Sequence, residues 1–309
     1  MHYLNSLVVK VFLIIVVSYN QPRFCPSATW NSTALTFANV STVGIHPYGI
    51  FVNINDTVYV NNQQQSQIIV WFKGDINPTI INATKSSSPL SIFVTITNDI
   101  YIDSSDGGIH TWKLNPIQEL FTLNTSTRCL DIFISSNNVL YCSLSAIHIV
   151  IKISLDNNDT QIITVAGTGS NGSTSFMLNS PRGILLDINS NLYVADYGNN
   201  RIQFFRTGQL NATTIAGNGA PGTIDLFYPI DIVFDGDGYL FITDSANHRI
   251  VGSDINGYRC IVGCFGNGSS PDKLSSPHGL AFDSYGNIFV TDYFNNRIQK
   301  FFLATNSCS

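Results

Sequence analysis

The sequence predicts an all-β fold, a six-bladed β-propeller. Short apolar runs of strand length occur in groups, the groups recur every forty to fifty residues, and no helical period fits the best-defined group, residues 277–301. The chain has 309 residues, a normal length for one large all-β domain. Hydrophobic residues make up 44% of the chain and charged residues 11%, so a core can form and disorder is not expected.

Six units align on the start of their first apolar run. The third residues of that start lie 42, 40, 52, 48 and 48 residues apart, a spacing typical of propeller blades with four strands each. These third residues are Gly49, Ser91, Asp131, Gly183, Asp231 and Gly279. In the fourth unit we expect strands at about 183–187, 191–195, 201–206 and 212–216, and in the fifth at about 231–234, 239–243, 249–254 and 258–262.

The sixth unit has three strands and then only residues 303–309, which are too few for a good fourth strand. Residues 34–40 precede the first unit and resemble the fourth strands that begin near Thr164 and Thr214. An open ring would leave an edge of unpaired backbone groups. We therefore predict that strand 34–40 completes the last blade and closes the ring.

The first residues differ from the rest of the chain. Residues 7–17 form an apolar run broken only by Lys10, which has signal-peptide length and is too short for a comfortable membrane span. The predicted organisation is a signal peptide at 1–18, an N-terminal segment at 19–33 and the propeller at 34–309. We expect secretion, with an uncleaved membrane anchor as the alternative, and no stable membrane span in the later sequence.

Cysteines and glycosylation sequons fit a secreted chain. An even number of cysteines predicts three disulfides, Cys25–Cys308, Cys129–Cys142 and Cys260–Cys264. The Cys25–Cys308 pair would clip the ring shut. Nine Asn-x-Ser/Thr sequons are candidates for glycosylation, at Asn31, Asn39, Asn55, Asn82, Asn124, Asn158, Asn171, Asn211 and Asn267.

Units four to six share a further motif, an Asp that ends the second strand and an Arg that begins the third. The segments run from Asp196 to Arg201, Asp244 to Arg249 and Asp292 to Arg297, each with an Asn-rich turn between. They closely resemble the NHL repeat, and this resemblance implies a six-bladed propeller. In units one to three Asn61, Asp103 and Cys142 hold the Asp position and the Arg is absent. We interpret the motif as structural turn chemistry rather than as a binding surface.

The resemblance also suggests an enzyme. The NHL family includes a zinc-dependent lyase of hydroxyglycine-extended peptides, in which three blades supply one His each, just before the small residue of the first strand. Here only His278 holds that position. In the first unit Tyr48 holds it, and His46 lies two residues before Tyr48. His46 and His278 are thus weak candidates for zinc, and Asp235-Gly-Asp237-Gly resembles only half a calcium loop. We expect no cofactor, with zinc or calcium as the alternative.

Polar residues at the starts of the first strands point to a ligand site. Tyr48, Asp131, Arg182, Asp231 and His278 are expected around one mouth of the channel, where propellers bind small ligands. Tyr197, Tyr293 and Phe294 lie in turns and suggest a binding rim. The net charge of −5 argues against nucleic acid as a partner.

The leading functional hypothesis is a non-catalytic extracellular module that recognises a protein or a small ligand through one face. The alternative is a metal-dependent enzyme with its site in the channel, either similar to the amidating lyase or a lactonase-like hydrolase.

Overall fold

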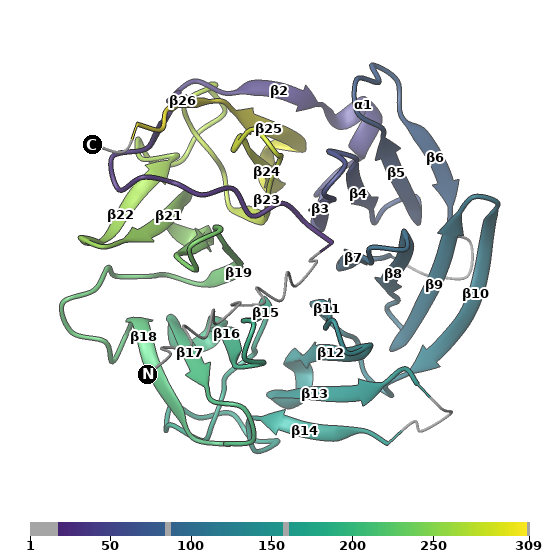
Figure 1. Cartoon of the computed structure of the whole chain (residues 1–309), viewed down its shortest axis with the longest axis vertical. Coiled ribbons are helices and arrows are strands. Elements are labelled where there is room, and N and C mark those ends of the chain that lie inside the picture. The colour runs from purple at the N-terminus through teal and green to yellow at the C-terminus, as the bar shows by residue number, and fades with distance from the viewer. Residues whose placement is uncertain (1–17, 84–87, 157–160, 308–309) are drawn as a thin grey trace, which may run out of the picture.

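Six four-stranded antiparallel sheets surround a central channel in the computed structural model, which describes residues 18–83, 88–156 and 161–307 (Figure 1). In each sheet the first strand lines the channel and the fourth lies outside. The predicted fold class and the number of blades are confirmed. Among the described residues, no helix is long and apolar enough to cross a membrane.

The first three blades use strands in chain order, as follows: β3 (Ile50–Val52), β4 (Val58–Asn62), β5 (Gln67–Trp71) and β6 (Thr79–Asn82); β7 (Ile92–Val94), β8 (Asp99–Asp103), β9 (Gly108–Leu114) and β10 (Ile117–Asn124); β11 (Ile132–Ile134), β12 (Val139–Leu144), β13 (Ile149–Ser154) and β14 (Ile163–Ala166). Blades four and five are β15 (Ile184–Leu186), β16 (Leu192–Asp196), β17 (Arg201–Phe205) and β18 (Ala212–Gly217); β19 (Pro229–Phe234), β20 (Leu240–Asp244), β21 (Arg249–Asp254) and β22 (Gly257–Val262). Four short 3₁₀-helices follow second strands, η1 (Ser145–Ile147), η2 (Tyr197–Asn199), η3 (Ser245–Asn247) and η4 (Tyr293–Asn295), and one α-helix, α1 (Val40–Val43), precedes the first blade.

The last blade joins the two ends of the chain. Its inner strands are β23 (Pro277–Phe282), β24 (Ile288–Asp292) and β25 (Arg297–Phe301), and its outer strand is β2 (Leu35–Ala38), which pairs antiparallel with β25. Closure by the N-terminal strand is thus confirmed. A second, shorter pairing of β1 (Thr29–Trp30) with β26 (Leu303–Thr305) extends this closure beyond the blade.

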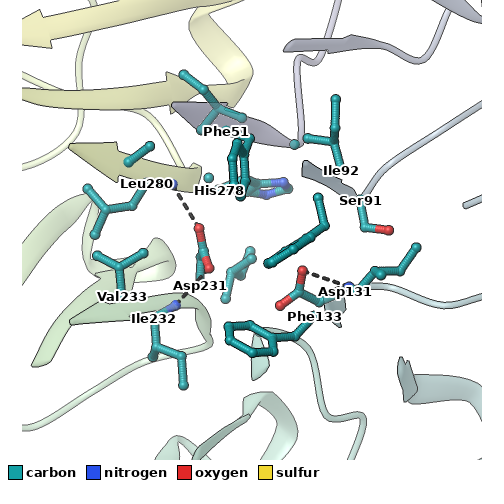
Figure 2. A pocket seen from close by; sticks show the side chains of 18 of the residues that line it. Phe51, Ser91, Ile92, Asp131, Phe133, Asp231, Ile232, Val233, His278 and Leu280 are labelled. Atoms are coloured by element: carbon teal, nitrogen blue, oxygen red, sulfur yellow. Dashed lines mark hydrogen bonds between the residues drawn. The ribbon is translucent and has the colours of Figure 1, made fainter. Parts of the chain in front are cut away.

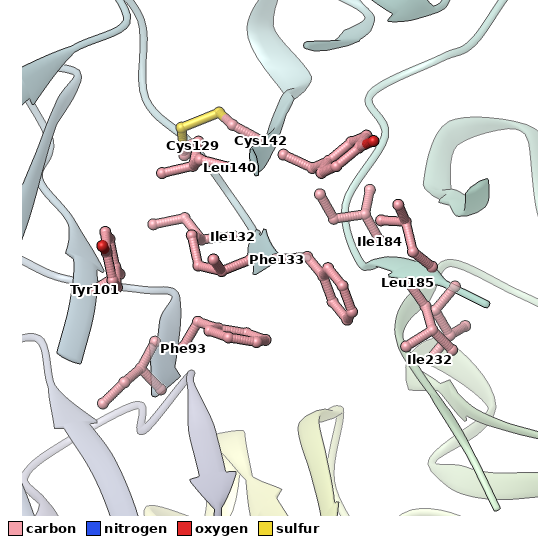
Figure 3. Packing of buried hydrophobic residues seen from close by; sticks show 14 of the residues in the cluster. Phe93, Tyr101, Cys129, Ile132, Phe133, Leu140, Cys142, Ile184, Leu185 and Ile232 are labelled. Carbon is pink, nitrogen blue, oxygen red and sulfur yellow. A yellow bond between two sulfur atoms is a disulfide. The ribbon is translucent and has the colours of Figure 1, made fainter. Parts of the chain in front are cut away.

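The blades pack face to face, which explains the burial of their strands. All residues of the second strands β4, β20 and β24 are buried, because both faces of an inner strand contact neighbouring blades. The outer strand β14 is exposed over its first two residues. Figure 3 shows how the first strands of neighbouring blades bring Phe93, Phe133 and Leu185 together around the channel.

Two predicted disulfides are present, Cys129–Cys142 and Cys260–Cys264. Cys129 lies just before β11 and reaches Cys142 on β12. Cys308 lies outside the described residues, so the Cys25–Cys308 bond stays a prediction. The backbone N–H of Cys25 donates to Asn306 Oδ1 at 2.8 Å, which places Cys25 beside the end of the described chain.

The Asp-to-Arg motif acts as a structural clasp, as its sequence predicts. In blade four, Asp196 Oδ2 accepts from Arg201 Nε at 2.7 Å and Oδ1 accepts from the backbone N–H of Asn179 at 2.7 Å. The Arg201 guanidinium also donates to the carbonyls of Ser173 and Met177 in the loop between blades. Equivalent Asp–Arg pairs occur in blades five and six, Asp244–Arg249 and Asp292–Arg297.

The first three blades replace this clasp in different ways. Asp103 of blade two accepts from Arg128 Nε at 2.7 Å, so an Arg from the next inter-blade loop supplies the guanidinium that the motif lacks. In blade three the Cys129–Cys142 disulfide makes a connection of its own, and in blade one Asn61 Nδ2 donates to the carbonyl of Ser91 at 2.7 Å. The absence of the motif Arg in these units therefore does not mean that the connection is missing. The expectation that Asn61 and Cys142 hold the Asp position is wrong, because the strand register places Cys142 level with Val194 and Asn61 level with Ala195.

A second set of hydrogen bonds joins neighbouring blades on the face where the first strands begin, which we call the upper face. The residue after each 3₁₀-helix has a left-handed backbone conformation. Its side chain accepts an N–H from the residue just before the Pro that begins the next unit. The donor–acceptor pairs are Ser180 N to His148 Nδ1 (3.0 Å), Tyr228 N to Asn200 Oδ1 (2.9 Å), Ser276 N to His248 Nδ1 (3.0 Å) and His46 N to Asn296 Oδ1 (2.9 Å). Imidazole nitrogen and amide oxygen thus play the same structural role.

Candidate functional site

The N-terminal segment closes the lower end of the channel, opposite the upper face. Residues 18–24 run from the channel toward the outer part of the ring (Figure 1). The Ser18 carbonyl accepts from Ile54 N in blade one at 3.0 Å, and the Pro22 carbonyl accepts from Gly236 N in blade five at 2.9 Å. Between them, Asn20 Nδ2 donates to the Asn53 carbonyl at 2.8 Å. The segment therefore spans the lower mouth rather than hanging free.

Tyr19 is the residue of this segment that closes the channel. Its ring makes edge contacts with Phe51 and Phe133, with centroids 6.2 and 6.3 Å apart, and Phe93 contacts both of those rings at 5.2 Å. Burial raises the pKa of the Tyr19 phenol. The narrow cavity above Tyr19 has a volume of about 100 Å³ and is lined by the first strands of all the blades.

Asp131 and Asp231 lie in this narrow cavity and point into it from blades three and five, which blade four separates (Figure 2). Asp131 Oδ2 accepts from Ile184 N of the next blade at 2.8 Å, and Asp231 Oδ2 accepts from Leu280 N of the next blade at 2.8 Å. Each carboxylate also accepts the N–H of the residue that follows it. Both acids therefore hold adjacent first strands together.

Ionisation of the two carboxyl groups is unfavourable in the folded protein. Burial, and then the nearby charge of Asp231, raise the pKa of Asp131 well above its usual value. Burial raises the pKa of Asp231 to about 7, although its backbone hydrogen bonds oppose the shift. A carboxyl group that is partly protonated near neutral pH can exchange a proton with a bound molecule.

Arg182, Tyr48 and His278 form the upper end of the narrow cavity. Arg182 Nη1 donates to the Tyr48 hydroxyl at 2.7 Å, and the guanidinium lies 3.9 Å from the centre of the Tyr197 ring. Arg182 Nε and His278 Nδ1 are buried and have no hydrogen-bond partner among the described residues. Burial lowers the pKa of His278 well below its usual value, helped by the charges of Arg182 and His46, so this imidazole is neutral.

Aromatic rings surround this polar end on two sides. Tyr293 stacks on His278 at 3.9 Å and on His46 at 4.6 Å, and Phe294 makes an edge contact with Tyr293. On the other side Tyr197 stacks on Tyr228 at 4.6 Å, and Tyr228 stacks on Phe227. These rings border a hollow of about 390 Å³ above the narrow cavity, which we call the upper mouth; its lining includes Tyr48, Arg182, Tyr197, Tyr228, His278 and Tyr293.

The structure thus brings together all five residues predicted for the channel, since Tyr48, Asp131, Arg182, Asp231 and His278 line one continuous cavity. Sequence reasoning missed Tyr19 and Tyr228. Tyr228 could have been found, because it holds the residue position before the first strand that His46 holds in blade one. Tyr19 gave no signal, since it lies in a segment without repeat character.

The metal candidates are not brought to one point. His46 and His278 stack on opposite faces of Tyr293, so the ring separates the two imidazoles. Within residues 18–83, 88–156 and 161–307, no three His, Cys, Asp or Glu side chains are grouped closely enough to hold a metal ion. Asp235 Oδ1 instead accepts the N–H groups of Asp237 and Tyr239 within a hairpin turn.

Eight of the nine predicted glycosylation sites lie within the described residues. Asn158 is outside the described residues, and the other sequon asparagines are all exposed, namely Asn31, Asn39, Asn55, Asn82, Asn124, Asn171, Asn211 and Asn267. None of them lines the hollow of the upper mouth.

Comparison with known proteins supports the fold. The NHL repeat matches residues 274–301, and comparison with functionally curated proteins finds no significant match. A gluconolactonase from Xanthomonas campestris has a TM-score of 0.66 at 15% identity, covering 94% of this chain and 97% of its own. A structure described as streptogramin B lyase has a TM-score of 0.63 at 15% identity, covering 88% and 97%.

A third similar structure is a protein of unknown function from Bacteroides thetaiotaomicron, with a TM-score of 0.70 at 15% identity, covering 88% of this chain and 76% of its own. At these identities the similarity establishes the architecture and not the activity. The chain is therefore a six-bladed β-propeller that carries an NHL repeat in its last blade.

Proposed function

We propose that this propeller is an extracellular binding module that takes a small ligand in its upper mouth without catalysing a reaction. The observation that carries the proposal is the combination of Arg182 Nε and His278 Nδ1, buried without partners, with aromatic rings on both sides. A buried polar atom without a partner costs stability, so a site that keeps two of them has a use for them.

The shape of the cavity favours a small ligand over a protein segment that passes through the ring. Tyr19 and the segment around it lie across the lower end and block passage through the whole ring, so we assign ligand entry to the upper mouth. The hollow of about 390 Å³ lies within the range of small-molecule sites in proteins. The two disulfides support an extracellular location, because such bonds persist in oxidising compartments.

Catalysis in the channel is the second candidate. Asp231, with a pKa of about 7, and Asp131 have the properties of an acid–base pair, and similar folds include a gluconolactonase and a lyase. The roles of these two acids as acceptors for adjacent strands favour structure instead, because their remaining contacts are backbone N–H groups. A metal-dependent reaction is less favoured, since Tyr293 separates the two candidate histidines.

A ligand screen with a matched variant tests the proposal. Tyr197 and Tyr293 are the first residues of η2 and η4, and serine holds this position in η1 and η3, so the double variant Tyr197→Ser/Tyr293→Ser should fold. We expect compounds from a diverse small-molecule library to raise the melting temperature of the native protein but not of this variant. Treatment with EDTA should leave those shifts unchanged.

The opposite results are equally clear. A library in which no compound distinguishes the two proteins would contradict a ligand site in the upper mouth. Turnover of a lactone or of a hydroxyglycine-extended peptide, lost in Asp231→Asn, would replace the binding module with an enzyme.

A further inference from the structure

We propose that the ligand of the upper mouth is a small aromatic acid, held by its carboxylate on Arg182 and by its ring between the aromatic walls. This inference rests on the proposed function and specifies the chemical class that the site recognises.

Arg182 differs from the other arginines that lie between or within the blades. Arg201, Arg249 and Arg297 each donate Nε to an Asp on the same blade, at 2.7, 2.8 and 2.7 Å. Arg128, from an inter-blade loop, donates Nε to Asp103 at 2.7 Å. Arg182 makes no ion pair within the described residues, and its Nε has no acceptor. Its positive charge is therefore available to an anion.

The contacts that Arg182 does make orient it for a carboxylate. Tyr197 lies against the face of the guanidinium, at 3.9 Å, and Tyr48 takes only the Nη1 donor. Guanidinium donors point outward in the plane of the group, so stacking leaves its edge open for two parallel bonds. A carboxylate matches this edge, whereas a neutral carbonyl can accept but brings no charge.

The acids below Arg182 set the depth at which an anion can bind. Asp131 and Asp231 point into the narrow cavity under the upper mouth (Figure 2). A carboxylate that moved past Arg182 would lose contact with this cation and would approach two buried acidic groups, which is unfavourable. The anionic end of a ligand is thus expected to stay at the level of Arg182 and His278, with the rest of the molecule in the wider hollow above.

The walls of that hollow suit a planar ring. Tyr293 with His278 forms one side, and Tyr197 with Tyr228 forms the other. Aromatic rings prefer offset-stacked or edge contacts with other rings, so a flat ligand gains from both sides. His278 is 7% exposed and its Nδ1 has no partner, so it can add a hydrogen bond to the acid.

Matched pairs of probes separate charge from shape. Cinnamate is a planar aromatic acid, cinnamamide has the same shape without the charge, and cyclohexylacrylate keeps the charge without the aromatic ring. Binding of each is measured by isothermal titration calorimetry on the native protein. We expect cinnamate to bind about tenfold more tightly than either of the other probes, the gain of one charge-assisted pair or of two ring contacts.

Variants then assign the effect to residues. Leucine holds the Arg182 position in blades two and three, as Leu90 and Leu130, so Arg182→Leu should fold and should bind cinnamate and cinnamamide equally. Arg206→Leu, on an exposed residue outside the upper mouth, is the control and should keep the preference for the acid. Melting curves confirm that both variants are folded.

Each other outcome has a definite meaning. Equal affinity of the native protein for cinnamate and cinnamamide, with both lost in Tyr197→Ser/Tyr293→Ser, would overturn the anion while retaining a ligand site. A preference for the acid that survives Arg182→Leu would also overturn it. If no probe binds, the aromatic-acid class is wrong, and the broader library decides whether the upper mouth binds anything.

Discussion

His248, which accepts one of the inter-blade hydrogen bonds, should make the fold sensitive to mild acid. His248 Nδ1 accepts the N–H of Ser276 at 3.0 Å, a role that Asn200 and Asn296 fill elsewhere with an amide oxygen. Protonation of His248 turns this acceptor into a second donor. The variant His248→Asn keeps an acceptor at every pH, so it isolates the effect of protonation.

The direction and size of the change in unfolding free energy with pH follow from the contacts of His248. Burial lowers the pKa of His248, against the opposing charges of Asp292 and Asp244, so the fold favours the neutral ring. A base with a lowered pKa contributes stability that is complete above its unfolded value of about 6.5 and is lost as the pH falls through the folded value. One backbone hydrogen bond is worth about 1 kcal/mol, and two donors facing each other cost about 1–3 kcal/mol.

Urea unfolding between about pH 5 and pH 8 tests this prediction, with the free energy of unfolding compared at each pH. The native protein and His248→Asn should have equal free energies of unfolding at the upper pH limit. At the lower pH limit the free energy of unfolding of the native protein should be about 1 kcal/mol below that of the variant. The reverse change, Asn200→His, should introduce the same dependence at another blade. Parallel curves for all three proteins would show that the hydrogen bond does not control stability.

Two further predictions concern ring closure and the channel. Deletion of Leu35–Ala38 removes the outer strand of the last blade, so we expect loss of the cooperative melt followed by circular dichroism; an unchanged melt would show that the ring closes without this strand. Burial raises the pKa of Asp231 to about 7, so the stability that its protonated form provides is complete below the unfolded value of about 4 and is lost as the pH rises through 7. Asp231→Asn should therefore gain in free energy of unfolding relative to the native protein as the pH rises, and a constant difference would contradict this reasoning.

Much of the site could be predicted from position in the repeat. Tyr48, Arg182 and His278 occupy the same place at the start of a first strand, and first strands of a propeller converge on the channel, so their proximity follows from the alignment alone. Their chemistry does not follow in the same way. That Arg182 lacks an ionic partner while Arg128 has Asp103 depends on which loop crosses which blade, and the sequence motif suggested no such partner for Arg128.

The sequence by itself determined the strands, the number of blades and the closure by residues 34–40, because these depend on short-range patterns of apolar residues and turns that repeat along the chain. Only the tertiary structure decided that Tyr19 closes the channel and that Tyr293 separates His46 from His278. Contacts of this kind join residues far apart in the chain, and no local pattern encodes them. The same holds for Arg182, whose charge is unpaired because the folded ring places no ion-pair partner beside it among the described residues.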